Sequence, residues 1–245
     1  GKARAYQKGE TTIKVIAKAS NSTSSSNKAN KVTNINVYVG AYIDSAQQLE
    51  TTRIKVDFKT DVTSYDMKAS DFSISNNKTK RTFTVKDISV SGNSVILTTN
   101  DKINDGGTYT VKYDKSSAKF TATDGRITSM EISPTVVPEK TKTEINVNLK
   151  DKGGVVVESY NTANKPKYVD FSISTNSGFV SYDGKLYLNS VQSTATARAV
   201  YHTYNYEKDE SGKTVETGMV DTGNVTITAS EIREPDPTPS YNPYS

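Results

Sequence analysis

The sequence predicts an all-β protein built from tandem β-sandwich modules. Three observations predict it: apolar and polar residues alternate over short runs, turn signals separate these runs, and no long helical pattern is present. Only 33% of the 245 residues are hydrophobic. This composition is too polar for one thick core, but it suits thin sandwiches, because each sheet buries one face and exposes the other.

Several runs show the alternation clearly. In each, every second residue is apolar and its neighbours are polar, so one face of a strand can be buried while the other is hydrated. The clearest runs are 53–59, 109–113, 144–150 and 224–229. We expect these residues to form the two cores: Phe58, Phe72, Leu97 and Val111 in the first module, and Ile132, Val147, Phe171, Leu186 and Ile227 in the second.

Turn signals separate the runs, and strands spaced about 8–12 residues apart with such turns are typical of a sandwich. They contain glycine or asparagine, which tolerate positive φ angles. The signals lie at 91–93, 104–107, 124–125, 152–154, 183–184 and 211–212. A single helical turn is predicted, over Ser45–Leu49.

The chain divides into four parts. Residues 1–33 comprise terminal strands and a polar linker, too poor in apolar residues to fold alone. Residues 34–123 form a first full module, and residues 124–234 form a second. Residues 235–245 form a Pro-rich tail, for which we expect an extended polyproline II conformation.

A short segment of the first part is repeated near the end of the second module. Residues 2–6 (KARAY) resemble residues 196–201 (TARAVY), and a strand led by glycine follows each. Residues 1–33 are therefore predicted to hold the last strands of a preceding module. Either the chain is cut from a longer tandem array, which we favour, or the hairpin docks elsewhere. An exposed strand edge frays or pairs with another chain, so we expect either disorder before about residue 30 or a contact of residues 10–19 with another copy.

Residues 124–234 resemble the bacterial Ig-like domains common in invasins, cell-wall adhesins and surface-layer (S-layer) proteins. Asp170-Phe171-Ser172 occupies the place where the family usually has Trp-Ser-Ser, with Phe in place of Trp. The remaining motifs follow in the family's order: an opening strand at 127–134, a second strand at 140–149, a turn at 183–186 and a closing strand at 193–197. An insertion from Tyr204 to Gly223 departs from the compact form of the family.

Residues 34–123 resemble Ig-like modules of S-layer proteins from Gram-positive bacilli. The matching segments are Ser70–Ile74 (SDFSI), Ser91–Leu97 (SGNSVIL) and Gly106–Val111 (GGTYTV). The two resemblances together imply tandem immunoglobulin-like β-sandwich modules.

For function, the resemblances imply a structural module of an S-layer protein that contributes to self-assembly of the cell-surface array. Its partners would be neighbouring copies of the same protein, and its location the extracellular face of a bacterial cell or its wall. The alternative is a glycan- or protein-binding module of an adhesin or phage fibre, with cell-wall glycan as a partner.

Composition argues against cysteine-based sites, membrane insertion and nucleic-acid binding. The chain has no Cys, which fits a bacterial exterior and rules out cysteine nucleophiles and zinc–thiolate sites. No stretch approaches the about 18 consecutive apolar residues of a spanning helix, so no membrane insertion is expected. The net charge is +4, and the densest basic run, Lys78–Arg81, is short. Nucleic-acid binding needs a clustered basic footprint, so no nucleic-acid partner is expected.

No catalytic residue and no enzymatic activity are predicted. The single histidine, His202, falls on the strand face opposite to Ala197, Ala199 and Tyr201, so we expect a side chain that is solvated or lies on the sheet surface. Candidate carboxylate pairs for glycoside hydrolysis are Asp57 with Asp61 and Asp101 with Asp105. Both pairs lie at strand ends or turns, where Asp commonly caps the backbone.

Two candidate binding sites remain. Asp101, Asn104 and Asp105 cluster in one loop, where their oxygens could hold calcium, and no other cofactor is expected. A plain turn is the favoured alternative. Tyr204 and Tyr206 share the face of His202 and are candidates for ligand binding, because exposed aromatic rings form sugar platforms. Cross-strand packing on the inserted hairpin is the favoured alternative for these two tyrosines.

Overall fold

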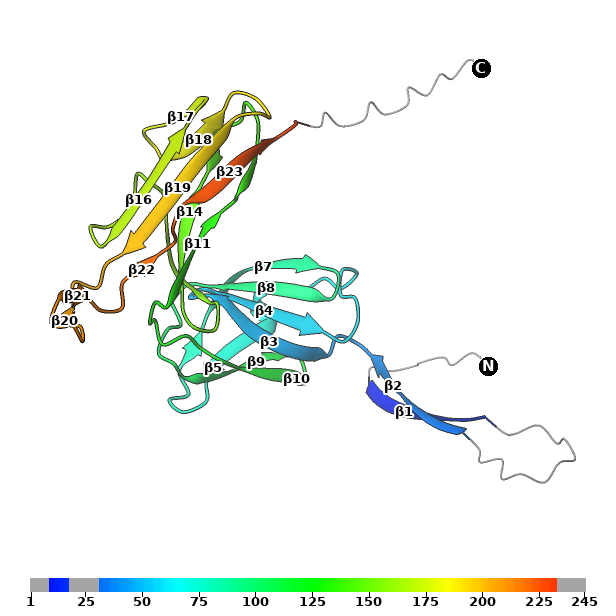
Figure 1. Ribbon diagram of the computed structural model, residues 1–245. Helices are drawn as coiled ribbons and strands as arrows, with labels where there is room; N and C mark the ends of the chain where they lie inside the picture. The colour runs from blue at the N-terminus through cyan, green and yellow to red at the C-terminus, as the bar shows by residue number, and fades with distance from the viewer. Residues whose placement is uncertain (1–8, 18–30, 233–245) are drawn as a thin grey trace, which may run out of the picture. The chain divides into compact units, whose positions relative to one another are not determined.

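The structure, a computed structural model, describes residues 9–17 and 31–232 (Figure 1). Within these residues every regular element is a strand, apart from one short 3-10 helix, η1 (Ala69–Asp71). The predicted all-β class is therefore confirmed. The chain separates into two compact units, with the division between Ala122 and Thr123. The division predicted from the sequence lies one residue later, between residues 123 and 124.

The first two strands form a hairpin. β1 (Gly9–Ala17) pairs antiparallel with β2 (Lys31–Val39), with Gly9 opposite Val39. Residues 10–17 thus have a partner strand within the chain, so the expectation of disorder is wrong for them, and a contact with another copy stays a prediction. β2 also runs through the predicted module boundary between residues 33 and 34. Residues 2–6, 18–19 and the Pro-rich tail 235–245 lie outside the described residues.

The first module packs two antiparallel sheets against each other. One sheet has the order β10-β9-β5-β6, and the other has the order β3-β4-β8-β7. Their bounds are β3 (Ile43–Glu50), β4 (Arg53–Phe58), β5 (Phe72–Asn76), β6 (Thr82–Phe83), β7 (Val85–Ser91), β8 (Ser94–Thr99), β9 (Thr108–Tyr113) and β10 (Ser116–Thr121).

The core of this module comes from the inward faces of both sheets. All four residues predicted from alternation, Phe58, Phe72, Leu97 and Val111, are buried. The Phe58 ring meets Phe72 edge-on, with ring centroids 6.4 Å apart. Alternation therefore identified this core correctly, since the period of a strand is two residues.

The predicted helical turn at Ser45–Leu49 is wrong, because this segment belongs to β3. Its residues pair with β4, although the register shifts between Ile43 and Ser45 and between Gln48 and Glu50. Gln48 is buried and its Nε2 donates to the Ile103 carbonyl oxygen at 2.7 Å. Pairing with β4 thus decides the conformation here, over the local preference of the segment.

The second module is also a sandwich. One layer has the order β12-β23-β19-β16, with β22 beside β19; β12 runs parallel to β23, and the other pairs are antiparallel. The facing layer contains the groups β11-β14-β15 and β13-β18-β17.

The strands of the first layer are β12 (Val136–Pro138), β16 (Val169–Thr175), β19 (Thr194–Tyr201), β22 (Val220–Asp221) and β23 (Val225–Ser230). Those of the second are β11 (Ser129–Ser133), β13 (Thr143–Glu144), β14 (Asn146–Lys150), β15 (Val156–Tyr160), β17 (Gly178–Val180) and β18 (Lys185–Leu188).

The second core also matches the prediction. Ile132, Val147, Phe171, Leu186 and Ile227 are all buried between the layers. On β19 the buried residues are three alanines at every second position, 195, 197 and 199, while Thr196 and Arg198 are exposed. This strand therefore has a small inner face, and its outer face is free to carry polar groups.

The predicted insertion Tyr204–Gly223 contains a separate hairpin. β20 (Tyr206–Lys208) pairs antiparallel with β21 (Thr214–Glu216), and the chain then returns to the module through β22. Figure 1 shows this hairpin beyond the end of β19. Within the described residues, no helix has the length and apolar character needed to cross a membrane.

Candidate functional site

His202 follows directly after β19, at the base of the inserted hairpin. Its face is the predicted one, opposite to the buried alanines, but its side chain is only 22% exposed. Nδ1 lies 2.9 Å from Oε2 of Glu216 on β21, and Nε2 lies 3.2 Å from Oδ2 of Asp170 on β16. The histidine thus links the hairpin to the sheet, a role that its position in the sequence did not predict.

These contacts determine the charge of the imidazole. A neutral ring has one donor and one acceptor nitrogen, so only the imidazolium donates to both carboxylates at once. The hydrogen bond to Glu216 raises the pKa of His202 above its usual value, with Asp170 adding to the effect. The same bond, followed by the backbone N–H of Tyr204, lowers the pKa of Glu216. The three side chains therefore form an ionic cluster.

Tyr204 extends this cluster outward. Its ring stacks on His202, with centroids 5.5 Å apart and planes at 13°. Its backbone N–H donates to Oε1 of Glu216 at 2.7 Å, and its hydroxyl donates to the Lys167 carbonyl oxygen at 2.9 Å. The side chain remains exposed, so the predicted candidate Tyr204 is an aromatic surface held in place by several contacts.

Tyr206, the second candidate, is placed differently. It lies on β20 of the hairpin, opposite Glu216 in the strand register, and is exposed. No ring contact joins Tyr206 to Tyr204 among the residues that the structure describes. The two predicted ligand-binding tyrosines therefore do not form one stacked surface.

A second polar cluster, not predicted from the sequence, surrounds Glu158. Oε2 of Glu158 lies 3.0 Å from the hydroxyls of both Tyr160 and Tyr168, and the two hydroxyl oxygens are 3.1 Å apart. Burial raises the pKa of Tyr160, and its hydrogen bonds to Tyr168 and Glu158 raise it further. Tyr168 also meets Tyr201 edge-on at 6.1 Å. No sequence motif joins these residues, because they meet only where β15, β16 and β19 end near one another.

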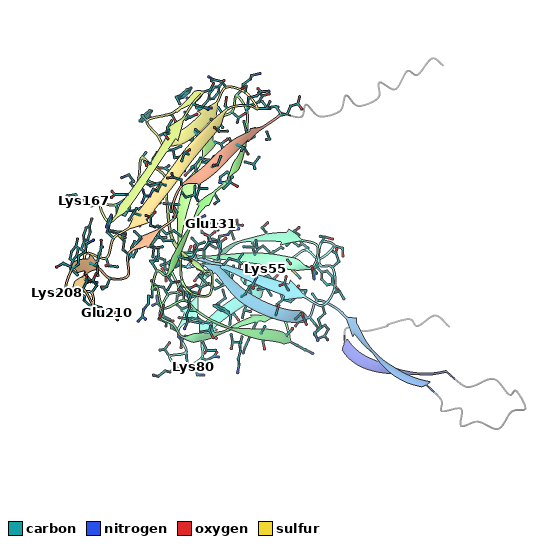
Figure 2. The ribbon with its side chains drawn as sticks, in the orientation of Figure 1. Lys55, Lys80, Glu131, Lys167, Lys208 and Glu210 are labelled. Carbon is teal, nitrogen blue, oxygen red and sulfur yellow. The ribbon has the colours of Figure 1, made fainter. Side chains whose placement is uncertain are left out.

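Members of both clusters line one surface depression, which we call the hairpin-base depression. Its lining residues are Gly125, Ile127, Glu158, Tyr168, Tyr201, His202, Thr203, Tyr204 and Asn205. In Figure 2, Lys167, the neighbour of Tyr168, is labelled at the same end of the module as Lys208 and Glu210 of the hairpin. The depression combines aromatic walls with hydrogen-bond acceptors, and neither Lys nor Arg lines it.

In the predicted calcium loop, the two aspartate side chains make hydrogen bonds and an ion pair within the protein. Oδ2 of Asp105 accepts from the Tyr109 hydroxyl at 3.0 Å and from Nδ2 of Asn76 at 3.1 Å, and Oδ1 accepts from the Gly107 N–H at 2.9 Å. Asp101 instead pairs with Arg81 at 3.3 Å, and Asn104 is exposed.

Residues 9–17 and 31–232 contain no group of three or more His, Cys, Asp or Glu that could hold a metal. Calcium binding by Asp101, Asn104 and Asp105 stays a prediction.

The other candidate carboxylates have structural contacts. Asp57 pairs with Lys55 at 3.0 Å and accepts a hydrogen bond from the Ser94 hydroxyl. Asp61 accepts from the backbone N–H of Thr63 at 2.8 Å, which caps the turn after β4. Both residues therefore stabilise the ends of strands, as carboxylates at turns commonly do.

Comparison with solved structures finds domains of the bacterial S-layer protein SbsC. Its N-terminal part is 20% identical, with a TM-score of 0.41, over 78% of this chain and 44% of that one. Its domains 1–6 are 20% identical, with a TM-score of 0.49, over 79% and 26%. A pullulanase of Group B Streptococcus is 12% identical, with a TM-score of 0.30, over 72% and 23%.

The chain thus spans less than half the length of each of these structures. A scan against protein-family models gives no match, and neither does a search of the curated proteins. Similarity at this level does not identify a function, because one fold serves many functions.

Proposed function

We propose that the chain is a structural module of a bacterial S-layer protein, located outside the cell, where copies of the protein assemble into a surface array. One observation carries the proposal. The residues on which the sequence resembles Ig-like modules of S-layer proteins occupy positions in the first module that build its sandwich.

Each of the three matching segments has such a position. In the first, Oδ2 of Asp71 accepts from the Lys68 N–H at 2.8 Å, and Phe72 is buried. In the second, Gly92 has φ +59° at the turn between β7 and β8, a conformation that favours glycine. In the third, Tyr109 and Val111 are buried. The resemblance thus involves residues that fold the module, which supports a structural role.

The outward faces of the strands support contacts between copies. On β4, Lys55 pairs with Asp57, and on β19, Arg198 pairs with Asp221 on β22. Faces that carry both signs of charge attract complementary faces of other molecules and favour particular orientations. Exposed pairs of this kind are individually weak, so assembly requires several contacts for each copy.

The test is self-association of the chain. Sedimentation velocity at increasing protein concentration, with and without calcium, should show reversible oligomers whose size grows with concentration. A chain that remains monomeric at every concentration, in both conditions, would contradict the array function.

The alternative is a glycan- or protein-binding module of an adhesin or phage fibre. The exposed ring of Tyr204, held flat against His202, favours it, because sugars stack on such surfaces. A binding module should stay monomeric and be retained by immobilised cell-wall glycan. Loss of that retention in Tyr204→Ala, together with a monomeric wild type, would support this function over the array.

We propose no catalytic role for the chain. Its only histidine lies between two carboxylates that raise its pKa and so favour the protonated ring, which has no free lone pair to act as a general base. Assays against esters, peptides and bacterial wall glycans should show no turnover above buffer. Turnover that disappears in His202→Ala would overturn this assignment.

A further inference from the structure

We propose that the hairpin-base depression binds the cationic end of a lysine or arginine side chain from a second copy of this chain. The proposal rests on the array function above and specifies one contact within it. Three properties of the depression support it: an excess of hydrogen-bond acceptors, aromatic walls and the absence of Lys and Arg from its lining.

Around Glu158 there are more hydrogen-bond acceptors than protons to satisfy them. Three oxygens, from Glu158, Tyr160 and Tyr168, lie within 3.0–3.1 Å of one another, but the two hydroxyls supply only two protons. The other carboxylate oxygen of Glu158 has no hydrogen bond to any residue that the structure describes. A carboxylate in this position can accept from an ammonium or guanidinium group, which forms stronger hydrogen bonds than a neutral donor.

The walls suit a cation on an apolar stem. The rings of Tyr168 and Tyr201 meet edge-on, and Tyr204 lines the same depression. Aromatic faces attract Lys and Arg head groups, and the methylene stems of these side chains pack against apolar surface. The depression thus offers both an electrostatic and an apolar contact to one long basic side chain.

The charge balance favours a basic ligand from the protein itself. The positive charge of His202 is shared between Glu216 and Asp170, so it does not neutralise Glu158 as well. The chain as a whole has 31 basic and 27 acidic residues. An acidic depression on a basic chain is complementary to the chain's own surface.

Such a contact has consequences for assembly. Where the basic side chain comes from a different surface of the next copy, the contact is heterologous. Heterologous contacts repeat from copy to copy and generate rings or open assemblies rather than a closed pair. This contact is therefore suited to an extended array.

The test compares two isosteric substitutions. Glu158→Gln removes the charge at the depression, whereas Glu210→Gln removes one at the exposed hairpin turn. We expect Glu158→Gln to weaken self-association about three- to tenfold, because an ion pair supported by a cation–π contact is lost. Glu210→Gln should associate as the wild type does. Tyr204→Ala removes one wall of the depression at an exposed position and should also weaken self-association. It provides the test if Glu158→Gln does not fold.

A small probe tests the site separately from assembly. Nα-acetyl-lysine amide, titrated into the wild-type chain, should shift the ring resonances of Tyr168 and Tyr201, and this shift should be lost in Glu158→Gln. If the wild type does not associate but binds the probe, the array function fails and the cation site is supported. Unchanged ring resonances, or self-association equal to the wild type in Glu158→Gln, would overturn the proposal.

Discussion

Nδ1 of His202 and Oε2 of Glu216 are 2.9 Å apart, and this contact ties the β20–β21 hairpin to the end of β19. Glu216 also accepts from the backbone N–H of Tyr204, so one carboxylate fixes both the ring and the chain that leaves the strand. On the other side of the ring, Asp170 holds Nε2. The inserted hairpin is therefore held to its module by the charged contacts of His202, together with the hydrogen bond from the Tyr204 hydroxyl to the Lys167 carbonyl oxygen and the pairing of β22 with β19.

The attachment of the hairpin should weaken as pH rises. The folded pKa of His202 is raised above its ordinary value of 6.5, mainly by Glu216. A raised folded pKa contributes stability that is fully present below 6.5 and is lost as pH rises through the higher folded value. Hydrogen exchange of the β20–β21 amides, corrected for the intrinsic rate, should thus be faster at about pH 9 than at about pH 6.

The control for this prediction is His202→Gln. Glutamine keeps a hydrogen-bonding side chain but has no titration in this range, so the corrected exchange of its hairpin should not change with pH. An equal pH response in the two proteins would show that another group controls the attachment.

The two predicted core phenylalanines should be essential for stability. Phe72→Ala or Phe171→Ala should lower the free energy of unfolding of its module by roughly 3–5 kcal/mol, since each removes a buried ring and leaves a cavity. Phe179 is 45% exposed, so Phe179→Ala should cost much less. Denaturant unfolding measures all three. A loss under about 1 kcal/mol for Phe72 or Phe171 would contradict its place in the core.

Replacing Asp105 or Asp101, the two acidic residues of the candidate calcium loop, should lower the free energy of unfolding by different amounts. Asp105→Ala removes the acceptor of three hydrogen bonds, one of them from the buried Tyr109, and should cost about 1–2 kcal/mol. Asp101→Ala breaks only an exposed ion pair with Arg81 and should cost under about 0.5 kcal/mol. Equal losses in thermal unfolding would mean that Asp105 has no special role in the loop.

Calorimetry with calcium checks the loop as a metal site. We expect either no heat of binding or a weak event that the double change Asp101→Ala plus Asp105→Ala abolishes. Tight binding that survives this double change would place the calcium site elsewhere in the chain.

Gly178 should tolerate no side chain. A Cβ added there would lie 2.0 Å from the Tyr187 carbonyl oxygen, and φ is +149°. Gly178→Ala should therefore cost about 2–4 kcal/mol through overpacking and backbone strain. Gly212, at φ +81° with open space around it, is the control, and Gly212→Ala should cost about 1 kcal/mol. Similar unfolding midpoints for the two variants would show that β17 shifts to remove the clash.

The strands and cores could be predicted from the sequence because the signal for them is local. Ile54, Val56 and Phe58 alternate with polar residues, and a strand places every second residue on one face, so burial followed directly. The same two-residue period put His202 on the outer face. It could not show that this face is half-buried there, because the covering groups belong to other strands.

What the tertiary structure alone decided is which distant residues meet. Asp170 and Glu216 lie 32 and 14 residues from His202, and the Glu158 cluster joins the ends of separate strands. Pairing with β4 also overrode the local helical pattern at Ser45–Leu49. The alternation of a strand determines which side of it is buried. It carries no information on which strand lies beside it, since that depends on the packing of both sheets and on the path of the loops between them.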